Sequence, residues 1–328
     1  MLLALSFACA WIIIGLVGQI DWDAVRDSLT KLAWWQAPVL LLLLVCRQVP
    51  NAAPLAFFTE GVGLRRAVQN DQAAIMMSTV SPPPADLVLR LAMFRSWDIL
   101  VSRGLAGVLM NTLTFYVIRF SAPVLGLLLV LVTSVPYVDG YAWIAGAGAA
   151  VAITLGVVLW AVLRRESAAV WVGTTAGRFS ARFRKSVDPE GWAASAVEFR
   201  SHVVMRSHRG VPLSLAALTV MVVVDALLLA TCLRLVGIPA DALSTLAIVA
   251  VYLTFYPFTL FPLAGLGVLD ALVVAALVDT GGLDLEPELV AGLIVYRVTT
   301  LAVPLLFGVG SLAWWRRTDG KGAVDATQ

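Results

Sequence analysis

Apolar residues occur along this chain in long continuous runs, rather than in the alternating pattern of a half-buried β-strand. A helix needs about 20 mostly apolar residues to cross the hydrocarbon core of a bilayer. Apolar runs predict helical spans at residues 2–20, 36–58, 98–118, 123–137, 141–163, 211–233, 243–262, 266–278 and 289–314. The run at 266–278 is short for a simple crossing, so we expect about eight full spans.

Two segments interrupt this pattern, one in each half of the chain. Residues 67–94 are partly apolar, with three prolines at 82–84 followed by Asp86. Residues 261–268 combine proline with glycine just before Asp270. Proline removes a helical hydrogen bond and glycine permits unusual backbone angles. The segments predict either broken helices or ordinary loops between spans.

Interrupted apolar segments at corresponding positions of two halves are typical of the central site of a transporter. We therefore predict an all-α, polytopic transmembrane helical bundle with about eight spans plus one or two broken or re-entrant elements. We also consider an inverted repeat of the two halves. The run at 2–20 has no basic residues before it, so we expect a first span or an uncleaved anchor rather than a removed signal.

Composition supports the membrane interpretation. Hydrophobic residues make up 60% of the 328 positions and charged residues only 13%, against about a quarter charged in soluble proteins. The net charge of +2 is too small to indicate a nucleic-acid partner. The three cysteines lie in apolar runs, and the two histidines are six residues apart, so we expect no metal and no cofactor.

Basic residues concentrate between residues 164 and 210 and again at Arg316, Arg317 and Lys321. Because positive charge marks the cytoplasmic side, we expect this segment and the carboxy-terminus in the cytoplasm, in a multi-pass protein of the cell's inner membrane. Aromatic residues among the basic ones favour an amphipathic helix on the anionic leaflet over a plain solvated linker. The predicted divisions are 1–163 with broken element 67–97, 164–210, 211–317 with broken element 261–279, and the tail 318–328.

Charged residues within apolar runs are the candidate site. An ionisable group at the centre of a membrane helix costs about 2.5–3.5 kcal/mol, so each is a functional candidate. Together with the residues of the second break, the candidates are Arg47, Asp86, Arg90, Arg95, Asp225, Pro262, Gly265, Gly267, Asp270 and Arg297. Arginine suits phosphate because its planar fork binds two oxygens at once. Internal pairing, for example of Arg297 with Asp270, is the alternative to ligand contact.

Several motifs carry a family resemblance. The segment 261–270, Phe-Pro-Leu-Ala-Gly-Leu-Gly-Val-Leu-Asp, and Arg297 with Pro304 and Gly308 are two of them. The others are Pro84-Ala85-Asp86 with Arg90 and the segment 93–97. With these, roughly residues 35 to 317 resemble the transmembrane region of lysylphosphatidylglycerol synthases and their stand-alone, flippase-like relatives. Leu263 and Ala264 stand where the family usually has glycines, and Asp270 where it has glutamate.

The resemblance implies a non-enzymatic flippase that moves an anionic or aminoacylated phospholipid, or a polyprenyl-linked lipid, between leaflets. Arg90 and Arg297 would hold the phosphate, while Asp86 and Asp270 would contact cationic parts of the headgroup or carry protons. Expected partners are membrane lipids with anionic headgroups and an envelope glycosyltransferase or aminoacyl-transferase. The alternative is a non-transporting scaffold for an envelope enzyme complex, with residues 164–210 as its working surface.

Overall fold

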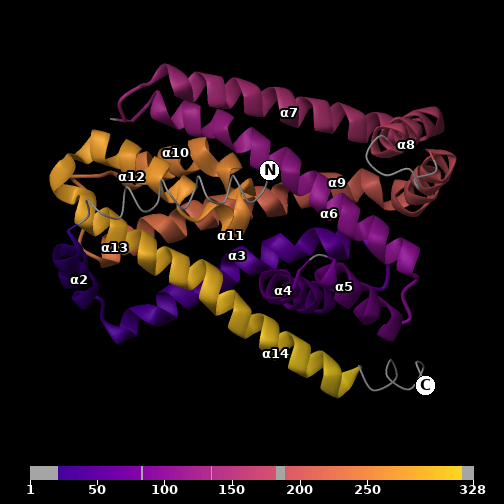
Figure 1. Cartoon of the computed structure of the whole chain (residues 1–328), viewed down its shortest axis with the longest axis horizontal. Coiled ribbons are helices and arrows are strands. Elements are labelled where there is room, and N and C mark those ends of the chain that lie inside the picture. Colours follow the sequence, from indigo (N-terminus) through magenta and orange to yellow (C-terminus); the bar gives the residue numbers. More distant parts are fainter. Residues whose placement is uncertain (1–20, 83, 134, 182–188, 320–328) are drawn as a thin grey trace. The chain divides into compact units, whose positions relative to one another are not determined.

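The computed structural model describes residues 21–82, 84–133, 135–181 and 189–319, and these residues form helices and connecting turns without a β-strand (Figure 1). The all-α prediction is therefore confirmed for this part of the chain. The expected span at 2–20 lies outside the described residues, as does most of the tail 318–328.

Six helices of the described residues are long and apolar enough to cross a membrane. They cover Trp34–Phe58, Val101–Val130, Gly140–Arg164, Glu190–Leu235, Pro262–Gly281 and Leu283–Thr318. A shorter apolar helix covers Thr245–Leu260. Several of these stretches contain more than one kind of helical turn. Two of the changes lie beside candidate residues, one at the start of the helix that contains Asp270 and one directly after Arg297.

Chain contacts divide the protein into two compact units. Unit 1 contains the described residues up to Arg47, with Arg119–Ala150 and Val220–Val303. Unit 2 contains Gln48–Ile118, Val151–Thr219 and the described residues from Pro304 onward. Each unit therefore draws on both halves of the sequence, and the long helices α3 (Ala37–Phe58), α6 (Val101–Val130), α7 (Asp139–Arg164) and α9 (Pro189–Leu235) contribute residues to both.

Two of the expected spans prove to be one helix. Residues 98–118 and 123–137 were predicted as separate spans, but α6 runs unbroken from Val101 to Val130 through Arg119 and Pro123. A proline in a helix removes one backbone hydrogen bond, which does not require a turn. Similarly, α9 begins at Pro189 within the predicted basic segment and continues to Leu235, while α8 (Glu166–Ala181) forms the other described helix of that segment.

The break in unit 1 follows α10 (Thr245–Phe255) and a 3₁₀ turn, η2 (Tyr256–Leu260). The short turn α11 (Pro262–Gly265) then places Leu263 and Ala264 at φ values of 51° and 55°, a left-handed conformation that side chains disfavour. Gly265 and Gly267 follow at 79° and 84°. Helix α12 (Val268–Gly281) begins directly afterwards, so four left-handed residues among five reverse the chain between two helices.

The break in unit 2 separates α4 (Leu64–Val80) from α5 (Ala85–Ser96), and the two helices pack against each other. Helix α4 ends at Val80, and the extended backbone of the next residue, Ser81, leads into Pro82. Neither helix reaches the roughly 20 residues that a crossing requires. Both pack in a cluster with the carboxy-terminal helix α14 (Val303–Thr318), where Trp315 donates from Nε1 to the hydroxyl of Ser96 at 2.8 Å.

Close helix contacts at small residues support both units. In unit 2, a Cβ on Gly308 would lie 2.3 Å from the Cβ of Met76 and 2.6 Å from the carbonyl oxygen of Gln72, so α14 touches the backbone of α4. In unit 1, a Cβ on Gly126 would lie 2.4 Å from the backbone nitrogen of Thr254. Small residues at such contacts are typical of helix packing in membranes.

The left-handed turn of unit 1 yields a pair of opposed predictions. Leu263 is 52% exposed, so Leu263→Gly loses little packing and removes left-handed strain, and we expect it to raise the free energy of unfolding by up to about 1 kcal/mol. Gly265→Ala should lower it by about 1–3 kcal/mol, because the new Cβ would lie 2.6 Å from the carbonyl oxygen of Phe258. Thermal unfolding of the detergent-purified protein measures both, and equal shifts of the same sign would contradict the assigned backbone.

Candidate functional site

Asp225 on α9 is the most enclosed carboxylate of unit 1, with 1% of its surface exposed. Arg47 of α3 donates from Nε to its Oδ1 at 2.6 Å. The hydroxyls of Tyr252 and Tyr296 lie 2.8 and 3.0 Å from its two oxygens and 2.7 Å from each other. A buried charge is tolerated when it is paired and hydrogen-bonded, so this cluster holds α3, α9, α10 and α13 (Glu286–Arg297) together.

Asp270 and Arg297 form a second pair in the same unit. Arg297 lies at the carboxy-terminal end of α13, and its Nε and Nη2 approach Asp270 Oδ1 at 2.8 Å each. Its Nη1 donates to the carbonyl oxygen of Ala264 at 3.1 Å. The left-handed turn therefore presents a backbone acceptor to the guanidinium. In this structure Asp270 and Arg297 are paired with each other, as the alternative of internal pairing expects.

The carboxylate of Asp270 also begins α12. Its Oδ2 accepts the backbone N–H of Gly267 at 2.9 Å, in the manner of a capping box. A negative charge in the first turn of a helix is further stabilised by the helix dipole. Asp270 thus joins the end of the break to the first turn of α12 and to Arg297, and its removal would disturb all three.

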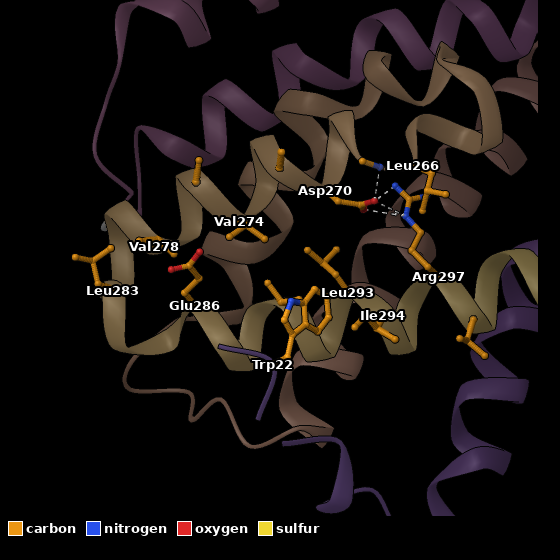
Figure 2. Close-up of a pocket in the computed structure, with 15 residues that line it drawn as sticks. Trp22, Leu266, Asp270, Val274, Val278, Leu283, Glu286, Leu293, Ile294 and Arg297 are labelled. Atoms are coloured by element: carbon orange, nitrogen blue, oxygen red, sulfur yellow. Dashed lines mark hydrogen bonds and ion pairs between the residues drawn. The ribbon is translucent and has the colours of Figure 1, made fainter. Parts of the chain in front are cut away.

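An apolar groove of about 450 Å³ lies between α12 and α13 beside these residues. Figure 2 shows Asp270 and Arg297 at one end near Leu266, with Val278, Leu283 and Glu286 toward the other end. Trp22 of α2 (Trp22–Thr30) borders it, and the intervening lining is aliphatic, from Val274, Ala275, Leu293, Ile294 and their neighbours. A mostly apolar pocket of this size with a few convergent polar groups is typical of a ligand site.

The helix changes from an α-helical to a π-helical hydrogen-bonding pattern immediately after Arg297. Residues Val298–Ala302 form a π-helical turn, and α14 follows from Val303. Single π-helical turns are rare and frequently occur at functional sites. The groove is therefore bordered by an irregular helix start at Gly267 and an irregular helix end at Arg297.

Arg90 of α5 belongs to a separate polar cluster in unit 2. Its Nη1 donates to Asn70 Oδ1 at 2.7 Å and its Nη2 to Asp71 Oδ1 at 3.1 Å, both on α4. Asn51 of α3 donates to Asp71 Oδ2 at 2.8 Å. The cluster connects α3, α4 and α5 in the way that the Asp225 cluster connects helices of unit 1.

The remaining sequence candidates lie apart from these pairs. Asp86 is half-buried in the first turn of α5, and Arg90 pairs with Asp71 rather than with it. Arg95 is exposed in the last turn of α5, and Pro262 is exposed at the start of α11. Within the described ranges, no group of His, Cys, Asp and Glu is arranged to hold a metal ion.

Sequence reasoning missed Asn70, Asp71, Tyr252 and Tyr296 as members of the polar clusters. A signal existed for the first two, because Gln69-Asn70-Asp71-Gln72 is a run of four polar residues within a predicted apolar segment. Three of the four are buried in α4. The tyrosines gave no such signal, because aromatic residues are ordinary in a membrane helix.

In the Asp225 cluster, we expect removal of one charge to destabilise the protein more than removal of both charges of the Arg47–Asp225 pair. Asp225→Asn leaves Arg47 without its carboxylate in an apolar surrounding, and we expect a loss of about 3–5 kcal/mol in the free energy of unfolding. The double variant Arg47→Met with Asp225→Leu should recover most of that loss. Thermal unfolding in detergent distinguishes the two, and a double variant less stable than Asp225→Asn would contradict the assigned role of the pair.

Comparison with known proteins places the chain in a family. A family model described as the lysylphosphatidylglycerol synthase TM region matches residues 1–308. No curated protein sequence gives a significant match. The family match covers most of the chain and agrees with the six span-forming helices of the described residues. The chain is therefore a multi-pass integral membrane protein of the lysylphosphatidylglycerol synthase TM region family.

Proposed function

We propose that this protein is a flippase-type lipid transporter that moves an anionic or aminoacylated phospholipid, or a polyprenyl-linked lipid, between leaflets. The observation that carries the proposal is the apolar groove between α12 and α13 with the Asp270–Arg297 pair at one end. A membrane lipid has the matching form, with a long apolar chain and a phosphate at its end. The family assignment supports the same class of substrate.

In the proposed mechanism, the lipid phosphate competes with Asp270 for Arg297. An arginine presents five N–H donors in a planar fork, and its bonds to carboxylate and phosphate have similar geometry. Exchanging one anion for another keeps the guanidinium paired throughout, which avoids the cost of an uncompensated charge in an apolar site. Asp270, released from Arg297, is then available to a cationic part of the headgroup or to a proton.

The groove would hold an acyl or polyprenyl chain while the headgroup engages the pair. Its wall residues are aliphatic along the length between the Asp270–Arg297 end and Glu286. Burial of a hydrocarbon chain there exchanges lipid for protein contacts at little net cost. The headgroup is the part that the bilayer core opposes, because charged groups are costly at its centre.

Transport of a phospholipid with a fluorescent headgroup into reconstituted vesicles tests the proposal. Arg297→Ala removes two charge-assisted contacts to the phosphate and should slow transport about ten- to a hundred-fold. Arg297→Lys should retain part of the activity, since lysine keeps the charge without the fork. Ala275→Phe should also slow transport by filling the groove, with the ion pair left in place.

Arg178→Ala, at an exposed position in the last turn of α8, is the matched control and should transport like the wild type. Each variant is compared at equal folded fraction, as judged by its melting curve. Wild-type rates in both Arg297→Ala and Ala275→Phe would exclude this groove as the transport site. Loss of function only on deletion of residues 164–210 would favour the scaffold alternative.

We further propose that the basic segment 164–210 and the carboxy-terminus face the cytoplasm, as the distribution of positive charge predicts. Single cysteines introduced in a background without Cys9, Cys46 and Cys232 report the side directly. Cysteine at Thr318 should react with an impermeant maleimide only after the membrane is opened. Asp284 lies at the opposite end of the span-forming stretch Leu283–Thr318, so cysteine at that position should react in intact cells. The reverse pattern would invert the assigned orientation.

A further inference from the structure

A second groove, of about 400 Å³, lies within unit 2 between α4 and α14. Four residues of α4 line it, namely Arg65, Val68, Gln69 and Gln72. The opposite wall is formed by α14 between Leu306 and Trp314. The α4 residues are spaced by three and four positions, so they share one helix face. The groove shares no lining residue with the one between α12 and α13.

We propose that this groove binds a diacyl glycerophospholipid with an anionic headgroup, as a site separate from the transport groove. The lipid phosphate would lie at Arg65, and an ester carbonyl would accept from the amide of Gln72. The acyl chain would lie against Leu306 and Phe307 of α14.

The Arg65 end has the features of a site for a headgroup phosphate. The guanidinium of Arg65 lies 5.9 Å from the ring centre of Trp314 and forms no ion pair within the described part of the chain. Tryptophan and arginine together are typical of the membrane interface. Gly63 begins α4 without a side-chain cap, so the positive end of the helix dipole lies beside Arg65.

The inner part of the groove holds a buried amide whose nitrogen lacks a partner. Gln72 is 2% exposed, and its Oε1 accepts from Gln48 at 3.4 Å, but its Nε2 makes no hydrogen bond with any described residue. A buried donor without an acceptor is destabilising, because it has lost its hydrogen bond to water and gained none in the protein. A rotation of the Gln72 side chain toward the groove would give this nitrogen a carbonyl acceptor from a bound lipid.

The spacing along α4 matches the order of groups in a phospholipid. Arg65 and Gln72 are seven residues apart, which is about 10 Å along a helix. Gln69 lies between them and is occupied, since its Nε2 donates to the carbonyl oxygen of Ser311 at 3.3 Å. A phosphate at the interface followed inward by ester carbonyls and then by hydrocarbon therefore meets a cation, an amide and an apolar wall in that order.

Melting of the purified protein with added lipids tests the proposal. Phosphatidylglycerol should raise the melting temperature more than phosphatidylcholine, and more than the ether-linked phosphatidylglycerol analogue, which lacks ester carbonyls. Gln72→Leu should abolish the difference between ester and ether lipids. Arg65→Gln should reduce the difference between the two headgroups, and Arg65→Gln combined with Ala275→Phe, which also fills the transport groove, should abolish it. Gly310→Leu should weaken the phosphatidylglycerol response about ten-fold in lipid concentration, because no atom lies within 4 Å of a Cβ there and the new side chain fills the groove.

Gly146→Leu on α7 is the matched control, since its Cβ also meets nothing within 4 Å, and it should respond like the wild type. The Ala275→Phe variant should keep the difference between ester-linked and ether-linked phosphatidylglycerol, which separates this site from the transport groove. A wild-type response in Gly310→Leu would overturn the proposal, as would an equal shift with inorganic phosphate alone. If Ala275→Phe abolishes transport but keeps the difference between ester and ether lipids, the two grooves are separate sites. If Ala275→Phe transports normally while Gly310→Leu loses the lipid response, the proposed transport site fails and this lipid site is supported.

Discussion

A charged side chain in an apolar surrounding must be accompanied by its counter-charge, and this constraint determines where the helices of this protein meet. Asp225 is enclosed by Arg47 and two tyrosine hydroxyls from three other helices. In unit 2, Asp71 receives Arg90 and Asn51 in the same manner. Because membrane helices gain little from hydrophobic contact with one another, polar contacts and close packing such as that at Gly308 must define their neighbours.

The same constraint explains the form of the break before α12. A chain that leaves the helical conformation at membrane depth exposes backbone groups that need partners. Arg297 supplies a donor for the carbonyl of Ala264, and Asp270 supplies an acceptor for the N–H of Gly267. The ion pair and the backbone irregularity therefore stabilise each other, and a substrate phosphate that engages Arg297 in the proposed transport cycle would also alter the support of the turn.

Much of this arrangement follows from local sequence, and the rest does not. The apolar runs and the proline and glycine positions indicate the helices and both breaks, because they act within a few residues. The sequence suggested the pairing of Arg297 with Asp270, but most partners are not identified by local sequence. Asp225 and Arg47 are separated by 178 residues, and no pattern near either residue indicates the other. Sequence also placed a boundary near Arg119 that α6 does not have, since a single arginine and a proline do not end a helix whose neighbours remain helical.

The long separation between Arg47 and Asp225 has a consequence for biosynthesis. Chain elongation at about 5–20 residues per second places roughly 10–35 seconds between the synthesis of the two residues. Helix α3 is therefore made well before the carboxylate that neutralises its arginine exists, and unit 2 similarly waits for α14 to complete its cluster. During that interval Arg47 must be sheltered by water, lipid headgroups or the insertion machinery, so the interaction that stabilises the finished protein also makes its unfinished form dependent on assistance.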